Sequence, residues 1–217
     1  GMRGLGHITH LCELAKPTIG VITNVGRAHI GEVGSIEGIA KAKLDNQLGG
    51  DLNKVCPILI HGDAAIAGQG IVYEVTQMAK LKGYSTGGTI HFVINNQVGF
   101  TTDFEDARSA IYCTDVAKII DAPVFHVNGD DPEAVVFVSR MAAEYRQEFN
   151  RDVFVDMVCY RRNGHNESDE PRFTQPTLYA NITNHPNPRE IYTQKLIKQG
   201  EIAAKLAEQM DAEFKAE

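Results

Sequence analysis

Two polar residues that each follow an apolar, β-branched run are the first candidates for chemistry. Asp63 in HGDAAIAGQG comes after PILI, and Asn96 in INNQVGF comes after TIHFVI. If each closes a strand, with a helix between them, a carboxylate and an amide oxygen can lie side by side. Magnesium prefers such oxygen ligands and leaves positions for water and phosphate. Each residue also has a plainer interpretation, because Asp after Gly often caps a helix and Asn-Asn often ends a strand.

The glycines around Asp63 suit an anionic ligand. They let the backbone approach closely and expose N–H groups at the start of the following helix. A diphosphate would sit at that position.

The elements that must position these residues alternate between strand and helix patterns. The runs are near-continuous in Val and Ile, which favours an α/β fold with a parallel, doubly wound sheet covered on both faces. Open sheets of this type bind ligands at the carboxyl ends of strands, so we expect Asp63 and Asn96 to meet there. The predicted strands are 18–25, 55–61, 89–95, 123–128 and 153–160.

The clearest helix spans 131–149. Asp131 is a suitable N-cap and Pro132 suits the first helical position. An apolar stripe at steps of three and four should face the sheet. Its members are Val135, Val138, Ala142, Tyr145 and Phe149. The chain is then polar and loop-like from 160 to 188, and we expect one charged C-terminal helix from about 189 to 216.

Composition excludes some partners. The 217 residues carry a formal net charge of −7, and no basic run is present. This balance argues against nucleic acid or an anionic membrane surface, and no apolar stretch approaches the ~20 residues of a membrane span. The four cysteines lie far apart without a C-x-x-C pair, which indicates reduced thiols and a cytoplasmic location.

Other histidines are weaker candidates. His61, His91 and His126 lie on or beside predicted strands, where a hydrogen-bonded structural role is the expected one. His7 and His10 have a spacing that could share a metal, but no cysteine or carboxylate completes the set, so we expect no zinc site there.

Four segments then show a resemblance. In order they are VCPILIHGDAAIAGQGIVYE, GGTIHFVINNQVGFTTD, YCTDVAKIIDAPVFHVNGDDPEAV and VDMVCYRRNGHNESDEPRFTQP. Over residues 55–200 the chain resembles the thiamine-diphosphate-dependent decarboxylating component of the 2-oxoglutarate dehydrogenase complex. The resemblance implies magnesium ligands at Asp63, at Asn96 and at the backbone carbonyl of Val98, with Asn95 supporting the turn.

The same resemblance implies which residues approach the diphosphate. Besides Asp63 and Asn96 they are Gly62, Ala64, Ala65, Gln69 and Gly70. The RRNGHNESDEP segment is similar to an Arg-x-x-Gly-His loop near the cofactor in related enzymes, which gives His165 a cofactor-loop role. A solvated surface histidine is the plain alternative, and Asn163 stands where pyruvate-type enzymes have another histidine.

Residues 1–43 resemble a different family, the central domain of Mur ligases of the D-alanyl-D-alanine-adding type. His29 and Lys43 match a magnesium-holding histidine and a carbamylated lysine of that family. The P-loop Gly-Lys-Thr is absent, so an ATP γ-phosphate site is not expected. The predicted organisation is a ligase-like segment at 1–43, a linker at 44–54 and a thiamine-diphosphate-binding unit at 55–217. The chain therefore reads as a chimeric fragment.

The expected function is the diphosphate- and magnesium-binding part of the enzyme. The full family enzyme decarboxylates a 2-oxoacid, passes a succinyl group to a lipoyl-bearing succinyltransferase component, and binds its cofactor between two subunits of a homodimer. The family's activating glutamate and substrate-reading histidines have no match here. No catalytic residue is assigned and the chain alone should be inactive. The alternatives are a non-catalytic α/β fragment or a remnant of an ATP-dependent Mur ligase.

Overall fold

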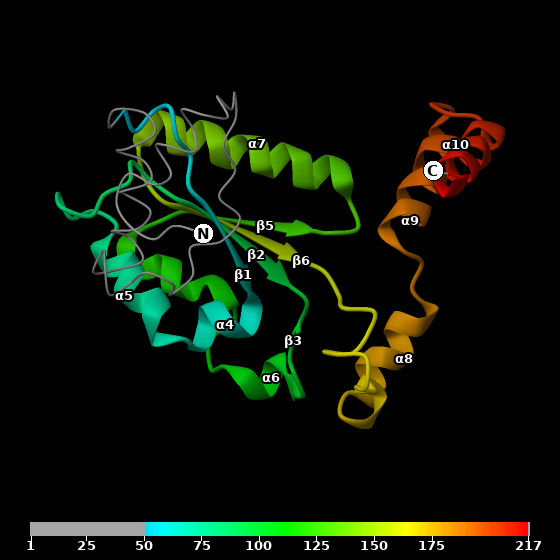
Figure 1. Ribbon diagram of the computed structural model, residues 1–217, viewed down its shortest axis with the longest axis horizontal. Coiled ribbons are helices and arrows are strands. Elements are labelled where there is room, and N and C mark those ends of the chain that lie inside the picture. The colour runs from blue at the N-terminus through cyan, green and yellow to red at the C-terminus, as the bar shows by residue number, and fades with distance from the viewer. Residues whose placement is uncertain (1–50, 217) are drawn as a thin grey trace.

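The centre of the molecule is a parallel sheet. A computed structural model describes residues 51–216, and its four-stranded sheet has the order β1-β2-β6-β5 (Figure 1). The bounds are Ile58–Gly62 for β1, Ile90–Asn95 for β2, Val124–Asn128 for β5 and Val153–Val158 for β6. Gly62 is opposite Ile94, while Asn95 and Asn128 are both opposite Val158, so all four strands end at one edge. The predicted parallel sheet is confirmed.

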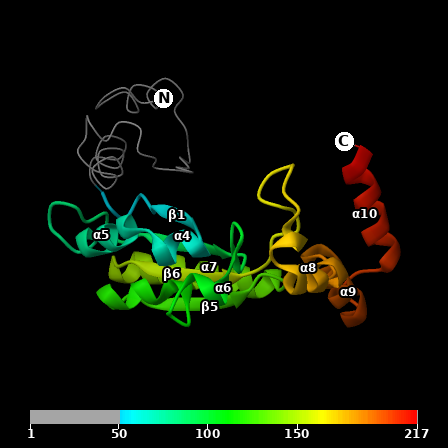
Figure 2. The same cartoon turned by 90° about the horizontal axis from the view of Figure 1, so that it is seen from below.

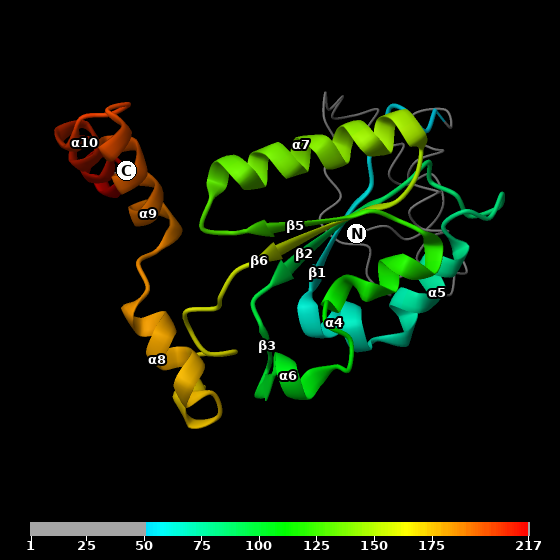
Figure 3. The same ribbon diagram turned by 180° about the vertical axis from the view of Figure 1, so that it is seen from behind.

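Helices cover both faces, as expected for a doubly wound fold. Helices α4 (Asp63–Gly68) and α5 (Gly70–Met78) and the 3-10 helix η1 (Cys113–Ile120) pack on one face, and α7 (Pro132–Phe149) packs on the other (Figures 1 and 3). Each interface has its own core. The first contains Ile66, Val72, Val93, Cys113, Ala117, Ile120 and Phe154, and the second contains Ile90, Val127, Ala142, Val153 and Val155.

The predicted helix at 131–149 is confirmed as α7. Asp131 caps it, since its Oδ1 accepts a hydrogen bond from the Ala134 N–H at 3.2 Å. The apolar stripe packs on the sheet except at its last member. Phe149 is 58% exposed and contacts the Tyr145 ring instead, because the helix ends there and Asn150 adopts a left-handed φ of 50°.

The C-terminal part differs from the expectation in two respects. The stretch predicted to be loop-like contains η2 (Pro171–Phe173) and α8 (Pro176–Asn184), in which a first-turn proline and buried Tyr179 and Ile182 favour a helix. The single predicted helix is two, α9 (Pro188–Gln199) and α10 (Ala204–Ala216), because Gly200 ends α9 with a φ of 77°. Figure 2 shows α8, α9 and α10 extending away from the sheet.

A short antiparallel pair links β2 to the helical layer. It is formed by β3 (Val98–Gly99) and β4 (Thr102–Asp103), and α6 (Phe104–Ala107) follows directly. No helix within residues 51–216 is long and apolar enough to cross a membrane. The three cysteines in this part of the chain, Cys56, Cys113 and Cys159, are free.

The predicted strand at 18–25, the ligase-like segment 1–43 and most of the predicted linker lie outside the described residues. The described end of that linker is attached to α7. Arg146 Nη2 donates to the Leu52 carbonyl at 2.8 Å, and Gln147 Nε2 donates to the Asn53 carbonyl at 2.9 Å.

Candidate metal and diphosphate site

Asp63 lies where β1 ends and α4 begins. The residue is 2% exposed, and the N-cap residue Gly62 has no side chain that could cap the helix. Burial raises the pKa of the Asp63 carboxyl, whereas backbone N–H groups and the Arg108 guanidinium act in the opposite direction. A buried carboxylate at this position is suited to a ligand that supplies positive charge, such as a metal ion.

Asn96 begins a tight turn at the end of the neighbouring strand. Its Oδ1 accepts a hydrogen bond from the Val98 N–H at 3.2 Å. Gln97 has a φ of 66°, and its Nε2 holds the turn by donating to the Cys159 carbonyl at 2.8 Å. Lone-pair capacity remains on an amide oxygen that accepts a single bond.

Gly99 places this turn against the start of α4. A Cβ at Gly99 would lie only 2.9 Å from the Cβ of Ala64, so the approach requires glycine. Ala64 follows Asp63, and Val98 precedes Gly99. The structure therefore brings the segments of all three predicted ligands, Asp63, Asn96 and Val98, to one corner of the molecule.

The other predicted cofactor residues are distributed along α4. Gly62, Ala64 and Ala65 lie at its start, beside the Asn96 turn. Gln69 and Gly70 are exposed at its far end, about 9 Å away for a helix of this length, where α5 begins without a side-chain cap. A Cβ at Gly62 or Gly70 would meet nothing within 4 Å, so the backbone is accessible at both positions.

His165 lies in an exposed loop that touches the Asn96 turn. The His165 ring contacts Phe100 edge-on at a centroid distance of 4.7 Å, and the backbone N–H of His165 donates to Asp169 Oδ2 at 2.8 Å. Arg161 Nη2 also donates to the Phe100 carbonyl, at 3.3 Å. Phe100 thus connects the predicted cofactor loop to the turn that carries the predicted metal ligands.

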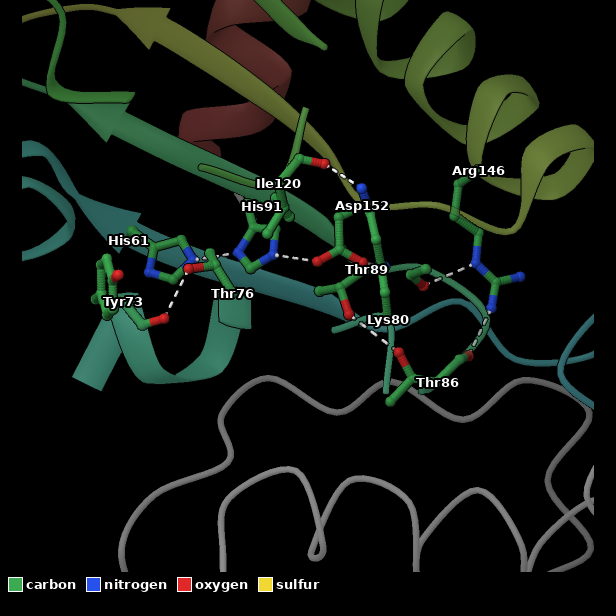
Figure 4. Close-up of polar contacts among 11 residues, drawn as sticks. His61, Tyr73, Thr76, Lys80, Thr86, Thr89, His91, Ile120, Arg146 and Asp152 are labelled. Carbon is green, nitrogen blue, oxygen red and sulfur yellow. Dashed lines mark hydrogen bonds and ion pairs between the residues drawn. The ribbon is translucent and has the colours of Figure 1, made fainter. Parts of the chain in front are cut away.

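The expected structural histidines are confirmed. His61 Nε2 and His91 Nδ1 are 3.0 Å apart, and His91 Nε2 is 3.4 Å from Asp152 Oδ2 (Figure 4). His91 also stacks on Phe154. His126 Nδ1 is hydrogen-bonded to Asp156 Oδ2 at 2.9 Å.

Sequence reasoning missed a buried polar network centred on Asp156. Asn95, which we expected to support the turn, instead donates from Nδ2 to Asp156 Oδ1 at 3.0 Å, and the Cys113 thiol lies 3.8 Å from the same oxygen. Burial together with the Asp156 charge raises the pKa of Cys113 to about 12, so it remains a thiol. The available signal was an aspartate inside the apolar run VFVDMV.

Arg108 is the other residue that the sequence did not reveal. It follows α6, its side chain is 9% exposed, and its Nη1 lies 3.7 Å from Asp63 Oδ2. Its Nε and Nη1 have no hydrogen-bond partner, and the same is true of the buried Asn95 Oδ1 and Thr114 Oγ1. Nothing in FEDARSA distinguishes this arginine from a surface residue.

The donor set fits a hard cation with an anionic ligand. Within the described residues no group of three His, Cys, Asp or Glu side chains could hold a metal, so an ion here would combine one carboxylate with amide and carbonyl oxygens. Magnesium accepts such sets when substrate phosphates complete the coordination. The Arg108 donors without a hydrogen-bond partner, and the start of α4, which no side chain caps, suit the phosphates.

Comparison with known proteins gives a consistent family. Residues 15–217 match the Dehydrogenase E1 component family. The chain is 49% identical over 213 residues to the 2-oxoglutarate dehydrogenase E1 component of Azotobacter vinelandii, covering 89% of this chain and 23% of that protein. It is 55% identical over 176 residues to the Multifunctional 2-oxoglutarate metabolism enzyme of Mycolicibacterium vanbaalenii, covering 80% of this chain and 14% of that protein.

A third relative has a composite name. The 2-oxoglutarate dehydrogenase E1/E2 component of Corynebacterium glutamicum is 49% identical over 207 residues, which is 94% of this chain and 17% of that protein. The chain thus spans less than a quarter of the length of these relatives. The match from residue 15 includes most of the segment that we compared with Mur ligases. The ligase resemblance and the chimera therefore stay predictions, whereas from residue 15 onward the chain belongs to the dehydrogenase E1 component family.

Proposed function

We propose that this chain forms the magnesium- and diphosphate-binding side of the thiamine diphosphate site in a 2-oxoglutarate dehydrogenase E1 component. The observation that carries the proposal is the packing of the Asn96 turn on the first turn of α4, next to the buried carboxylate of Asp63. This arrangement places oxygen ligands and helix N–H groups at the carboxyl ends of parallel strands, where open sheets bind cofactors.

In this proposal Asp63, Asn96 and the Val98 carbonyl hold magnesium, and phosphate oxygens complete its coordination. Backbone N–H groups between Gly62 and Ala65 face the diphosphate, and Gln69 and Gly70 line its approach. His165 closes the site from the loop beside Phe100. When bound, thiamine diphosphate supplies the nucleophilic carbon and the electron sink for decarboxylation of a 2-oxoacid.

The whole-enzyme activity is part of the proposal. It is the oxidative decarboxylation of 2-oxoglutarate with succinyl transfer to the lipoyl group of a succinyltransferase component, in the cytoplasm and as a homodimer. The composite E1/E2 name of the C. glutamicum relative supports such a partner. Because no activating carboxylate or substrate-reading histidine is assigned, the chain alone should bind cofactor weakly and not turn over. We assign this role to residues 55–217, with 44–54 as a linker.

Calorimetry of thiamine diphosphate binding tests the proposal. The native chain and Asp63→Ala are each titrated with the cofactor, with and without Mg²⁺. We expect heat only for the native chain with Mg²⁺, because the metal must bridge a carboxylate and an anionic phosphate that otherwise repel each other. Glu144→Ala is the control, since this exposed residue on α7 lies on the opposite face of the sheet.

Two results contradict the proposal. Equal heats in all four titrations would mean that the chain is an α/β unit without a cofactor site. Release of carbon dioxide from 2-oxoglutarate by the isolated chain would refute its inactivity, while leaving cofactor binding in place.

A further inference from the structure

We propose that Arg108 is a second cation of this site, carried by the protein itself. In the metal-free chain it is the counter-ion of Asp63, and when metal takes Asp63 the guanidinium donates to the diphosphate instead. This inference rests on the proposed function and adds to it a coupling between metal and cofactor.

The contact between Arg108 and Asp63 is close but incomplete. Nη1 lies 3.7 Å from Asp63 Oδ2, which is within ion-pair range and too long for a hydrogen bond. Nη1 therefore has no acceptor among the described residues, and Nε has none either. Water has little access to them, because the side chain is only 9% exposed. Burying charged donors without acceptors is costly, so an acceptor supplied by a ligand is expected. A planar guanidinium matches a phosphate in two-point contacts.

The surroundings leave the guanidinium room to change partner. Arg108 borders a cavity of about 240 Å³ between α4, α6 and η1, whose wall includes Ala67, Ala107 and Tyr112. The Cζ of Arg108 lies 5.7 Å from the centroid of the Phe104 ring, a contact that suits a cation without supplying an acceptor. Arg108 therefore has open space beside it, on a side where no described side chain supplies its unpaired N–H groups with an acceptor.

Arg108 should weaken the binding of the metal ion when diphosphate is absent and strengthen it when diphosphate is present. Without diphosphate, a metal ion and Arg108 compete for one carboxylate and repel each other, so the arginine weakens metal binding. With diphosphate, the anion lies between the two cations, and each strengthens its binding. Arg108 would thus disfavour metal alone and favour metal together with cofactor.

Two affinities measured on one set of variants test this coupling. Mn²⁺ alone is titrated and its free fraction followed by electron paramagnetic resonance, and thiamine diphosphate is titrated calorimetrically at saturating Mg²⁺. Arg108→Gln removes the charge, and Arg108→Lys keeps it without the planar fork. Arg140→Gln is the matched control, because Arg140 is 80% exposed on α7. Thermal melting of each variant verifies that it is folded.

We expect Arg108→Gln to bind Mn²⁺ at least about threefold more tightly and thiamine diphosphate at least about tenfold more weakly. The loss of cofactor affinity corresponds to about one charge-assisted hydrogen bond. Arg108→Lys should bind Mn²⁺ like the native chain and recover part of the cofactor affinity. Arg140→Gln should change neither value.

Each other outcome is decisive. If both affinities fall together in Arg108→Gln, the arginine only maintains the fold of the site, and the inference is wrong. Unchanged affinities would overturn it as well. If the folded native chain binds neither Mn²⁺ nor cofactor, the proposed function itself fails, which is a result distinct from a failure at Arg108.

Discussion

Asn95 Nδ2 donates a hydrogen bond to Asp156 Oδ1 at 3.0 Å, and this buried bond joins the last residue of β2 to the neighbouring strand β6. The next residue, Asn96, uses its side-chain oxygen in the turn toward Val98. Two adjacent asparagines therefore have different tasks. One is part of the buried network that fixes the edge of the sheet, and the other belongs to the candidate metal site.

Replacing Asp156 by alanine should destabilise the fold. The change removes the acceptor of Asn95 and His126 and leaves the buried amide of Asn95 without a partner. We expect the free energy of unfolding to fall by about 2–4 kcal/mol, as for other broken buried networks. Urea denaturation measures this loss. Asp106→Ala, at an exposed position on α6, is the control and should change stability by about 0.5 kcal/mol or less; equal losses would contradict the buried role of Asp156.

Arg146→Met should be at least as costly as Asp156→Ala, for a different reason. This arginine is 0% exposed and donates to the carbonyls of Gly88 at 2.9 Å and Leu52 at 2.8 Å. It also donates to the carbonyl of Thr86 at 3.1 Å (Figure 4). Methionine keeps most of the volume but leaves three carbonyls unpaired, so we expect a loss of about 3–5 kcal/mol in urea denaturation. The exposed counterpart Arg140→Met should lose about 0.5 kcal/mol or less, and a similar small loss at Arg146 would refute the prediction.

The fold was predictable because its signals are local. Apolar β-branched runs predicted the four strands of the parallel sheet to within a few residues, though not the short β3 and β4, and the Asp131-Pro132 pair predicted the start of α7. The predicted C-terminal helix was wrong at Gly200, where a single left-handed residue ends α9 inside a charged sequence of continuous helical character. A break of this kind depends on one φ angle, which hydrophobic periodicity does not encode.

The candidate site was predictable only in part. Asp63 and Asn96 follow strands directly, so topology places them at one edge. Arg108 reaches Asp63 from the end of α6, through a turn and hairpin whose path depends on the close contact of Gly99 with Ala64. Long-range contacts of this type leave no periodic trace in the sequence, and a lone arginine among polar residues is indistinguishable from a surface residue.

Gly88→Ala and Gly200→Ala form a matched pair for backbone strain. Both glycines have a positive φ, 93° and 77°. A Cβ at Gly88 would lie 2.4 Å from the Arg151 carbonyl oxygen, whereas a Cβ at Gly200 would meet nothing within 4 Å. We expect a loss of about 1 kcal/mol at Gly200 from the left-handed conformation alone, and about 3 kcal/mol or more at Gly88. Chemical denaturation of both variants checks this order, and equal losses would show that the loop moves freely away from Arg151.

Acid should destabilise the chain partly through His61. Burial, with a smaller contribution from the charge of His91, lowers the pKa of His61 to about 4. The unfolded chain therefore binds the proton more readily, and stability falls as the pH drops from about 6.5 toward 4, by up to about 3 kcal/mol. His61→Phe should flatten this part of the stability profile, measured by urea denaturation at each pH. The exposed His165→Gln should keep the native slope, and an unchanged slope in His61→Phe would assign the acid sensitivity to other groups.

The adjacent asparagines separate stability from metal binding. Asn95→Ala removes a 6% exposed amide that donates to Asp156, so it should lower the free energy of unfolding by about 1–3 kcal/mol. Asn96→Ala loses one partly buried turn hydrogen bond, at 3.2 Å, and should cost about 1 kcal/mol or less.

Their effects on binding should be reversed. Asn96→Ala removes a proposed oxygen ligand and should eliminate the Mg²⁺-dependent heat of thiamine diphosphate binding in a chain that stays folded. Asn95→Ala should retain that heat at a temperature where it is still folded, because its side chain faces Asp156. Loss of binding in the Asn95 variant alone would mean that Asn95, the last residue of β2, is the metal ligand instead of Asn96. The pair thus determines which asparagine is the ligand, independently of any catalytic measurement.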